Sequence, residues 1–348
     1  MTPKSATAGN PLRERSNESA SAVLAELRAA ARQGDSRAKA ALAEMLLTRP
    51  PVSLEEGTDW AVSGAQDGNA DACHIASLLS AWGLGLAQDW NRALDYLQLA
   101  AAAGHERDSR VLAGLADQWD IALGKSDPAL SAEQCRKFRA RIRINELLKL
   151  PLLRMVANSP RIALIDAFLT PATCDWLIAR AQPNLERAKV YDPSTGAETS
   201  SIRTNTEFHI GTFDSDLIVM LLQHRISALT GASLAGMEAC TILHYAPGEE
   251  FNRHYDCFDT STPENARIVA AEGQRVLTFL IYLNENYNGG ETEFPYLSKR
   301  FRGRKGDALM FWNIMPDFSP DLRTLHAGLP PLSGEKWLFS QWIRGRRP

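Results

Sequence analysis

The sequence is poor in cysteine and lacks the spacings that cysteine-based sites require. Its 348 residues include five cysteines, an odd number, and no two of them form a Cys-x-x-Cys pair. They are Cys73, Cys135, Cys174, Cys240 and Cys257. This pattern suggests neither a disulfide framework nor a zinc site. We therefore expect a protein of the reducing cytoplasm.

Long hydrophobic runs and a dominant charge are also missing. The longest nearly apolar stretch, 276–283, is far shorter than the roughly 18 residues that span a membrane. Residues 1–20 lack the apolar segment of a secretory signal and are expected to form a disordered tail. The formal net charge is −3, with 45% hydrophobic and 23% charged residues. These values are typical of a soluble globular protein and indicate neither a membrane nor a polyanionic partner.

The first third of the chain is rich in alanine and leucine and carries an internal repeat. An Ala-x-x-Gly signature recurs, with its glycines at Gly34, Gly68 and Gly104, which are 34 and 36 residues apart. A polar residue follows each glycine, as expected where a left-handed cap ends one helix and the next begins. A period near 35 is typical of stacked helical hairpins, so we predict an α-solenoid over residues 21–125. An alanine-rich helical bundle is the alternative.

The stretch QDWNRALDYLQLAAAAG at 88–104 resembles helical hairpin repeats of the Sel-one type, relatives of the tetratricopeptide repeat. This resemblance implies a surface that binds a protein partner rather than a catalytic domain. His74 and His105 have no second plausible ligand on the same face, so we expect them to be surface or core histidines and not metal ligands.

Residues 131–155 carry charges and leucines at helical spacing, which predicts a connecting helix ended by Pro151 and Pro160. We place a linker helix at 126–158 and a second domain at 159–348. There, strand-like runs alternate with turns, and helical patterns remain at 171–181 and 214–230. The runs lie at 162–165, 240–245, 251–256, 276–283, 307–312 and 337–343. They predict an antiparallel sandwich or jelly roll and, with the repeats, an α + β multidomain protein.

Residues with metal-ligand chemistry occur in the third run. His254 and Asp256 lie two residues apart, so on a strand their side chains point to the same face. His326 follows 70 residues later and completes a set of two histidines and one carboxylate. Such a set covers one face of an octahedral ion and leaves the other open, as in non-haem Fe(II) oxygenases. The spacing alone leaves Mn or Co open as occupants.

A lysine at an unusual place accompanies this set. Lys336 lies ten residues after His326, at the start of the last predicted strand, and there shares one face with Leu338, Ser340 and Trp342. A buried unpaired cation is costly, so the position predicts an anionic partner. The distal carboxylate of a dicarboxylate is a suitable one.

Four stretches, taken in order, resemble the prolyl 4-hydroxylase branch of the 2-oxoglutarate/Fe(II) dioxygenases over about residues 160–345. They are HYAPGEEFNRHYDCFD, GQRVLTFLIYLNENYNGGETEFP, KGDALMFW and LHAGLPPLSGEKWLFSQWI. The resemblance implies a double-stranded β-helix (jelly-roll) domain with His254, Asp256 and His326 as iron ligands and Lys336 as partner of 2-oxoglutarate. Three further residues match positions that line the co-substrate pocket, although each would also suit an ordinary sheet: Tyr245, Thr292 and Trp342.

The same resemblance places Arg203, Glu238 and Arg275 near a bound peptide, whose backbone they could orient by paired hydrogen bonds. Surface salt bridges are the alternative. The sequence has Asn205 where the prolyl hydroxylases usually show a serine, which leaves proline open as the target. The segments 192–201 and 258–273 are expected to be mobile loops at the mouth of the site.

Two basic segments remain. The run at 299–305 has six basic or aromatic residues in seven, which is compatible with nucleic-acid contact. We favour a solvated hairpin instead, because alternating side chains would place these charges on both faces and the whole chain is slightly acidic. Arg344, Arg346 and Arg347 are expected to form a solvated tail.

The resemblance thus implies an enzyme that uses Fe(II), 2-oxoglutarate and O₂, assisted by L-ascorbate, to hydroxylate an unactivated carbon with release of succinate and CO₂. A peptidyl proline is the leading substrate, with the helical repeats recruiting the protein that bears it. A free amino acid or another small molecule is the alternative substrate. A catalytically silent adaptor that acts through its repeats is the alternative of another class.

Overall fold

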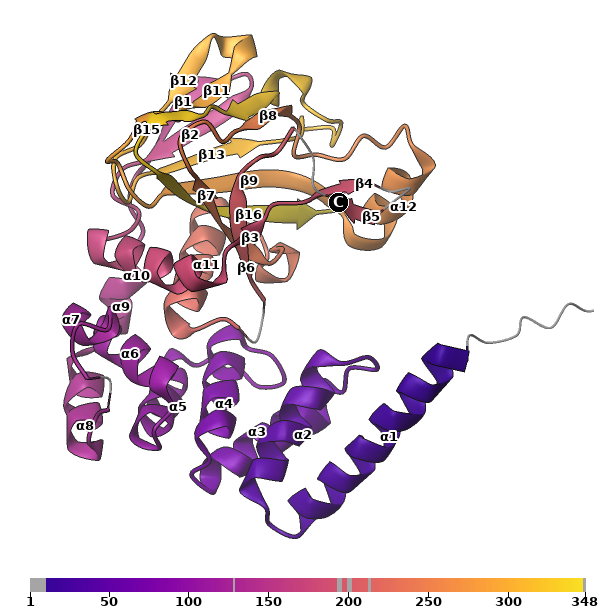
Figure 1. Cartoon of the computed structure of the whole chain (residues 1–348), viewed down its shortest axis with the longest axis vertical. Helices are drawn as coiled ribbons and strands as arrows, with labels where there is room; N and C mark the ends of the chain where they lie inside the picture. Colours follow the sequence, from indigo (N-terminus) through magenta and orange to yellow (C-terminus); the bar gives the residue numbers. More distant parts are fainter. Residues whose placement is uncertain (1–10, 128, 193–195, 199–201, 212–213, 347–348) are drawn as a thin grey trace, which may run out of the picture. The chain divides into compact units, whose positions relative to one another are not determined.

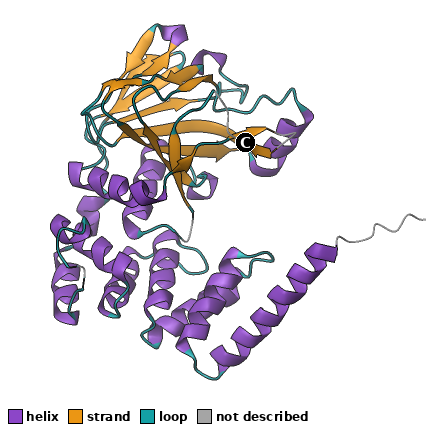
Figure 2. Ribbon diagram, viewed as in Figure 1, coloured by secondary structure: helices purple, strands orange, loops and turns teal. Residues whose placement is uncertain are grey.

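The computed structural model describes residues 11–127, 129–192, 196–198, 202–211 and 214–346. The chain divides into two compact units, Met1–Ile144 and Asn145–Pro348. Helices make up the first unit and strands dominate the second, which confirms the predicted fold class (Figure 2). Among the described helices, none is long and apolar enough to cross a membrane.

The first unit is a row of antiparallel helical hairpins (Figure 1). Its helix α1 begins at Pro11, so the second half of the expected tail is helical, while residues 1–10 lie outside the described part of the chain. The helices are α1 (Pro11–Arg32), α2 (Ser36–Thr48), α3 (Leu54–Gln66), α4 (Ala70–Trp82), α5 (Trp90–Ala102), α6 (Glu106–Leu115), α7 (Trp119–Ala122) and α8 (Ala132–Arg141).

The turns within the repeats have the predicted chemistry. Gly34, Gly68 and Gly104 have φ values of +92°, +79° and +91°, which an L side chain adopts only with strain. The polar residues that follow act as N-caps: Asp35, Asn69 and His105 each accept a hydrogen bond from a backbone N–H in the next helix. The repeat therefore marks the start of α2, α4 and α6.

One premise about this unit is wrong, although His74 is a buried histidine as expected. His74 and His105 do meet a third group, because Asp108, in the first turn of α6, contacts both. The Asp108 carboxylate is 3.0 Å from His74 Nδ1 and 3.1 Å from His105 Nδ1, and the two imidazole rings stack 4.7 Å apart. These contacts join two successive hairpins through side chains 34 residues apart, the period of the repeat.

The single connecting helix predicted at 131–155 is also wrong. Ser131 forms a capping box with Gln134 and starts α8, but the chain is extended at Ile142 and continues as the short helix α9 (Ile144–Leu147). After Pro151 it forms strand β1 (Leu153–Asn158), which pairs with β2 (Arg161–Ile165). A proline disfavours the helical conformation of the residue before it. Pro151 therefore prevents a helix from continuing past residue 150, although the spacing of the leucines suits one.

The second unit contains two antiparallel sheets that face each other. The larger has the strand order β1-β2-β13-β9-β16-β7-β6-β3 and the smaller β12-β11-β14-β8. The bounds of the larger sheet's remaining strands are β3 (Glu186–Arg187), β6 (Thr206–Ile210), β7 (Cys240–Tyr245), β9 (Gln274–Tyr282), β13 (Ala308–Trp312) and β16 (Lys336–Gly345). Those of the smaller are β8 (Phe251–His254), β11 (Thr292–Phe294), β12 (Lys299–Phe301) and β14 (His326–Gly328).

Alternation along the strands separates the core from the outer face. Leu243, Leu280 and Leu338 of the larger sheet pack with Phe294 of the smaller in one buried cluster. The intervening residues face outward, where Gln341 of β16 accepts a hydrogen bond of 3.0 Å from Gln223. Gln223 belongs to α11 (Leu217–Thr230), which covers the outer face together with α10 (Pro171–Ala181). The predicted jelly-roll arrangement is confirmed.

Two predicted loops contain regular structure. The segment 258–273 includes helix α12 (Pro263–Glu272), which Pro263 starts at its first position and Thr262 caps. The segment 192–201 contributes to a hairpin of β4 (Val190–Asp192) and β5 (Gly196–Glu198), and its other residues lie outside the described part of the chain. A pair of short strands, β10 (Asn288–Gly289) and β15 (Pro331–Ser333), completes the unit.

Candidate active site

The three ligands predicted from spacing come together on the smaller sheet. β8 ends at His254, Asp256 lies two residues further, and His326 opens β14, where it pairs directly with His254. One ligand atom from each residue lies within 4.8 Å of the other two. The Nε2 atoms of both histidines are 3.5 Å from the Asp256 carboxylate. The three donors therefore converge on one point, as a facial metal site requires.

Hydrogen bonds behind this triad fix its orientation. His254 Nδ1 donates to Asn252 O at 2.8 Å, and His326 Nδ1 donates to Thr324 O at 2.9 Å. Both Nε2 atoms consequently keep their lone pairs for a metal ion. Thr278 donates to Asp256 Oδ2 at 2.6 Å and leaves the other carboxylate oxygen available.

Electrostatics keeps the triad in its ligand-competent form. Burial disfavours ionisation of Asp256, but the neighbouring His326 and His254 outweigh it and hold the pKa of the carboxyl well below its usual range. Burial, together with His254, lowers the pKa of His326 to about 4. Metal binding requires a carboxylate and neutral imidazoles. Asp256 and His326 meet this requirement near neutral pH.

Lys336 is buried opposite the triad, as its position in the sequence predicted. Its side chain is 0% exposed, and Nζ has no hydrogen-bond partner among the described residues. It pairs in register with Tyr245 of β7, and Nζ lies 5.0 Å from the Tyr245 ring. Burial lowers the pKa of the lysine to about 7. An orphaned buried ammonium is the feature that an anionic ligand would satisfy.

A cavity connects Lys336 with the triad. Alternate residues of three adjacent strands, β7, β16 and β9, form its wall, so the predicted shared face of the last strand is confirmed. Tyr245, Thr292 and Trp342 all line this cavity, as the resemblance implied. Burial raises the pKa of Tyr245 to about 12, which keeps its hydroxyl protonated. Thr292 Oγ1 lies 3.1 Å from the Tyr282 hydroxyl.

An open groove of about 1250 Å³ meets the cavity at the triad. His254, Asp256 and Trp342 line both spaces, whereas Lys336 lines only the inner one. Residues of α12 and the segment before it form part of the groove's wall. The site therefore has a buried side for a small anion and an open side for a larger molecule.

Arg203, one of the predicted substrate residues, also lines both spaces but has partners within the fold. It is 6% exposed, forms an ion pair with Glu207 and donates from Nε to Asn205 Oδ1 at 3.2 Å. Asn205, the departure from the family pattern, is fully buried and orients this guanidinium. The substrate role of Arg203 stays a prediction.

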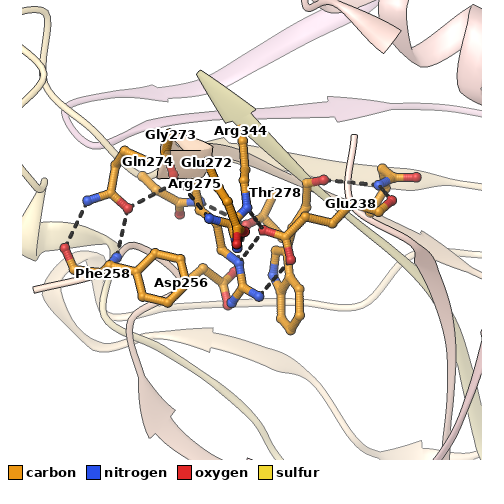
Figure 3. A network of polar contacts seen from close by, with 12 residues as sticks. Glu238, Asp256, Phe258, Glu272, Gly273, Gln274, Arg275, Thr278 and Arg344 are labelled. Atoms are coloured by element: carbon orange, nitrogen blue, oxygen red, sulfur yellow. Dashed lines mark hydrogen bonds and ion pairs between the residues drawn. The ribbon is translucent and has the colours of Figure 1, made fainter. Parts of the chain in front are cut away.

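The other two predicted substrate residues form a direct pair (Figure 3). Arg275 donates to both carboxylate oxygens of Glu238, from Nε at 2.7 Å and from Nη2 at 2.8 Å. The guanidinium lies over the Trp342 ring, with Cζ 3.6 Å from the ring centroid, and Phe258 flanks it at 5.0 Å. Arg275 lines the groove, while Glu238 stands behind it.

Sequence reasoning missed Arg344, which was assigned to a solvated tail. It lies in β16 with its side chain 13% exposed and joins the same network through Glu238 and Glu272. Its position two residues after Trp342 on a strand, hence on a shared face, was the available signal. Of the other tail residues, Arg346 is exposed and Arg347 lies outside the described part of the chain.

The basic run at 299–305 forms the hairpin that was favoured. β12 pairs with β11, and Arg300 forms an ion pair with Glu293 at 3.0 Å. Lys305 pairs with Asp175 of α10. Arg300 and Lys305 therefore have acidic partners within the fold, while Lys299 and Arg302 donate to backbone carbonyl groups.

Comparisons with known proteins agree with this site. Residues 240–344 match the family described as the 2OG-Fe(II) oxygenase superfamily. Prolyl 4-hydroxylase 5 of Arabidopsis thaliana is 34% identical over 213 residues, which cover 54% of this chain and 70% of that protein. Prolyl 4-hydroxylase 2 of the same plant is 33% identical over 215 residues, covering 55% and 69%.

Two solved structures are also similar. The viral collagen prolyl hydroxylase vCPH from Paramecium Bursaria Chlorella virus-1, in its 2OG complex, is 27% identical and covers 55% of this chain and 99% of that chain, with a TM-score of 0.43. A Sel1 repeat protein from Oxalobacter formigenes is 23% identical and covers 34% of this chain and 47% of that chain, with a TM-score of 0.26.

The jelly roll, the triad and the buried lysine define a non-haem iron oxygenase of the 2-oxoglutarate type. The donor set fits Fe(II), and the orphaned Lys336 ammonium fits the carboxylate of 2-oxoglutarate. The chain belongs to the prolyl 4-hydroxylase family of these enzymes. It is a 2-oxoglutarate-dependent dioxygenase that uses Fe(II) and O₂.

Proposed function

We propose that the enzyme hydroxylates a proline residue within a peptide or protein and converts 2-oxoglutarate to succinate and CO₂. The position of the triad carries this proposal, because it lies where the cavity that contains Lys336 meets the open groove. A small dicarboxylate suits the buried side, and an extended peptide suits the open side. The names of the Arabidopsis relatives support proline as the target.

In this proposal His254, Asp256 and His326 hold Fe(II) through the two Nε2 atoms and a carboxylate oxygen. When bound, the iron supplies the activation of O₂ that allows an unactivated C–H bond to be hydroxylated. The protein's contribution is positioning. Thr278 and the carbonyl groups of Asn252 and Thr324 keep the three ligands aimed at one point.

Lys336 binds the distal carboxylate of 2-oxoglutarate by a charge-assisted hydrogen bond. A nearby carboxylate favours the ammonium form, so the lysine takes up a proton when the co-substrate arrives above pH 7. The Tyr245 hydroxyl, protonated at any ordinary pH, and Thr292 support the same molecule. Leu243, Leu280 and Leu338 line the cavity and limit the entry of water.

On the groove side, Arg275 and Trp342 contact the peptide. Glu238 uses Nε and Nη2 of Arg275, and within the described residues Nη1 makes no hydrogen bond, so it can donate to a substrate carbonyl. The stacked indole offers a flat apolar face for a prolyl ring. Arg203, which lines both the cavity and the groove, contributes to the same binding, and Glu238 acts through Arg275.

The remaining assignments complete the proposal. L-ascorbate assists turnover, and the helical repeats bind the protein that carries the target proline. The five cysteines, all buried and free, support a cytoplasmic location. Hydroxylation of a free amino acid is the competing activity, and a silent adaptor is the competing role of another class.

Succinate formation by the iron-loaded protein tests the function. We expect iron-dependent turnover that proline-containing peptides stimulate, and loss of turnover in His254→Ala, Asp256→Ala and His326→Ala. Stimulation by small metabolites alone would favour the competing substrate. Complete absence of turnover under all conditions, in a protein that still binds partners, would favour the adaptor.

A further inference from the structure

Arg344 is the centre of the polar network beside the groove (Figure 3). Its Nε donates to Glu238 Oε1 at 2.7 Å, its Nη1 donates to Gly273 O at 3.1 Å, and its Nη2 lies 3.2 Å from Glu272 Oε2. All three nitrogen atoms of the guanidinium are therefore engaged. Arg344 thus connects its own strand, β16, to Glu238, which precedes β7, and to Glu272 and Gly273 at the C-terminal end of α12.

The register of the sheet places two arginines opposite each other, and the Glu238 carboxylate that they share compensates their charges. Arg344 and Arg275 are direct cross-strand partners on β16 and β9, next to an irregularity between Ile343 and Arg344. Like charges placed opposite each other destabilise a sheet unless they are compensated. Glu238 compensates both, because its Oε1 accepts from the Nε of each arginine at 2.7 Å. The position of the Arg275 guanidinium thus depends on Arg344.

The backbone of Glu238 is fixed as well. Its N–H donates to Trp342 O at 3.0 Å, and its carbonyl accepts from Gln341 Nε2 at 2.6 Å. Because the backbone of Glu238 is held in place, its carboxylate stays in contact with both arginines. The position of Arg275 is therefore coupled to that of Arg344 through Glu238.

The second function of Arg344 is to hold α12 as a wall of the groove. Asn265, Ile268 and Glu272 of this helix line the groove. Gly273 ends the helix with φ +90°, and a Cβ there would lie 2.8 Å from Gly345 O. Only glycine allows this close approach, which brings the Gly273 carbonyl to Arg344.

We propose that Arg344 is a positioning residue for peptide binding: it fixes Arg275 against Trp342 and holds α12 at the groove, without contacting the metal triad. This inference rests on the proposed peptide hydroxylase function. A lysine cannot replace Arg344, since an ammonium cannot reach the three partners that the planar guanidinium joins.

The test compares Arg344→Ala and Arg344→Lys with wild type in succinate formation, using an oligo-L-proline peptide. We expect KM for the peptide to rise about tenfold or more in both variants, the scale of effect that misplacement of a binding group produces. The KM for 2-oxoglutarate and the peptide-free turnover should stay within about twofold. An unchanged peptide KM, or an equal rise in both KM values, would overturn the proposal.

Arg346→Ala is the matched control, because Arg346 directly follows β16 and donates to Ala271 O of α12 but does not bind Glu238. It should raise the peptide KM much less than Arg344→Ala does, because Glu238 and Arg275 keep their contacts. Hydrogen exchange of residues 263–272 gives an independent readout: faster exchange in Arg344→Ala supports the proposal, and unchanged protection contradicts it. If no peptide stimulates wild type, the proposed function fails, while the exchange result still decides whether Arg344 holds α12.

Discussion

Replacing Lys336 by methionine should stabilise the protein in the absence of 2-oxoglutarate. Methionine keeps the length of the side chain and removes its charge. Burial lowers the pKa of Lys336 from 10.5 to about 7, and each pKa unit corresponds to about 1.4 kcal/mol. Since the lysine is fully buried, at pH 7 its charge lowers the free energy of unfolding by about 4 kcal/mol relative to a neutral side chain.

The sign of the pH dependence follows from the two protonation states. Between pH 7 and 10.5 the unfolded chain carries a proton on Lys336 that the folded chain has released. The contribution of this group to the free energy of unfolding of the wild-type protein therefore rises with pH. The advantage of Lys336→Met should therefore shrink from about 4 kcal/mol at pH 7 to about 1 kcal/mol at pH 10.

Urea unfolding of wild type and Lys336→Met at the same pH measures this difference in the free energy of unfolding. The contribution of the helical unit cancels in the difference, because that unit is identical in the two proteins. Addition of 2-oxoglutarate with Fe(II) should reverse the order, because wild type alone gains the carboxylate partner. A variant that is less stable than wild type at pH 7 without co-substrate would refute the reasoning, as would a difference that is the same at pH 7 and pH 10.

Three further outcomes test other parts of the structure. Thr278→Val removes the hydrogen bond to Asp256 and should weaken Fe(II) binding about 10–100-fold in metal titrations, whereas Thr278→Ser should retain it. A fragment of residues 145–348 should keep peptide-free succinate formation, and its failure to fold would show that the units are not independent. Gly104→Ala meets no atom within 4 Å of the added Cβ, so the left-handed backbone alone should lower the stability of the helical unit by about 1–2 kcal/mol in thermal unfolding, with turnover unchanged.

Much of the fold could be predicted because short-range physics determines it. Strand β7 and helix α10 have the bounds that alternation and capping predicted, 240–245 and 171–181. The turn glycines of the repeats have positive φ values, which few residues other than glycine adopt without strain. Strand periodicity predicted that Lys336 shares a face with Leu338, Ser340 and Trp342, and all four line the cavity. The predicted strand 251–256 ends early, at His254, so Asp256 meets the two histidines from the residues that follow β8.

What sequence reasoning missed depends on contacts between distant segments. Asp108 meets His74 only because successive hairpins stack, and nothing in the local sequence of α6 indicates that partner. Strand β1 exists because β2 offers a free edge at 161–165, whereas the sequence of β1 alone fits a helix equally well. Arg344 resembles any basic C-terminal residue until β16 places it opposite Arg275.

The same alternation also explains how one sheet supports both stability and chemistry. The inward side chains of β16 are those of Lys336, Leu338, Ser340 and Trp342, and all of them line the cavity. Leu338 belongs at the same time to the buried cluster between the sheets, so the wall of the site is part of the core. The packing energy of that core therefore holds Lys336 in place despite its destabilising charge. The rigid core on one side of the triad suits a co-substrate that is held in a fixed position. The polar network that is tied to α12 on the other side suits a peptide that must enter and leave.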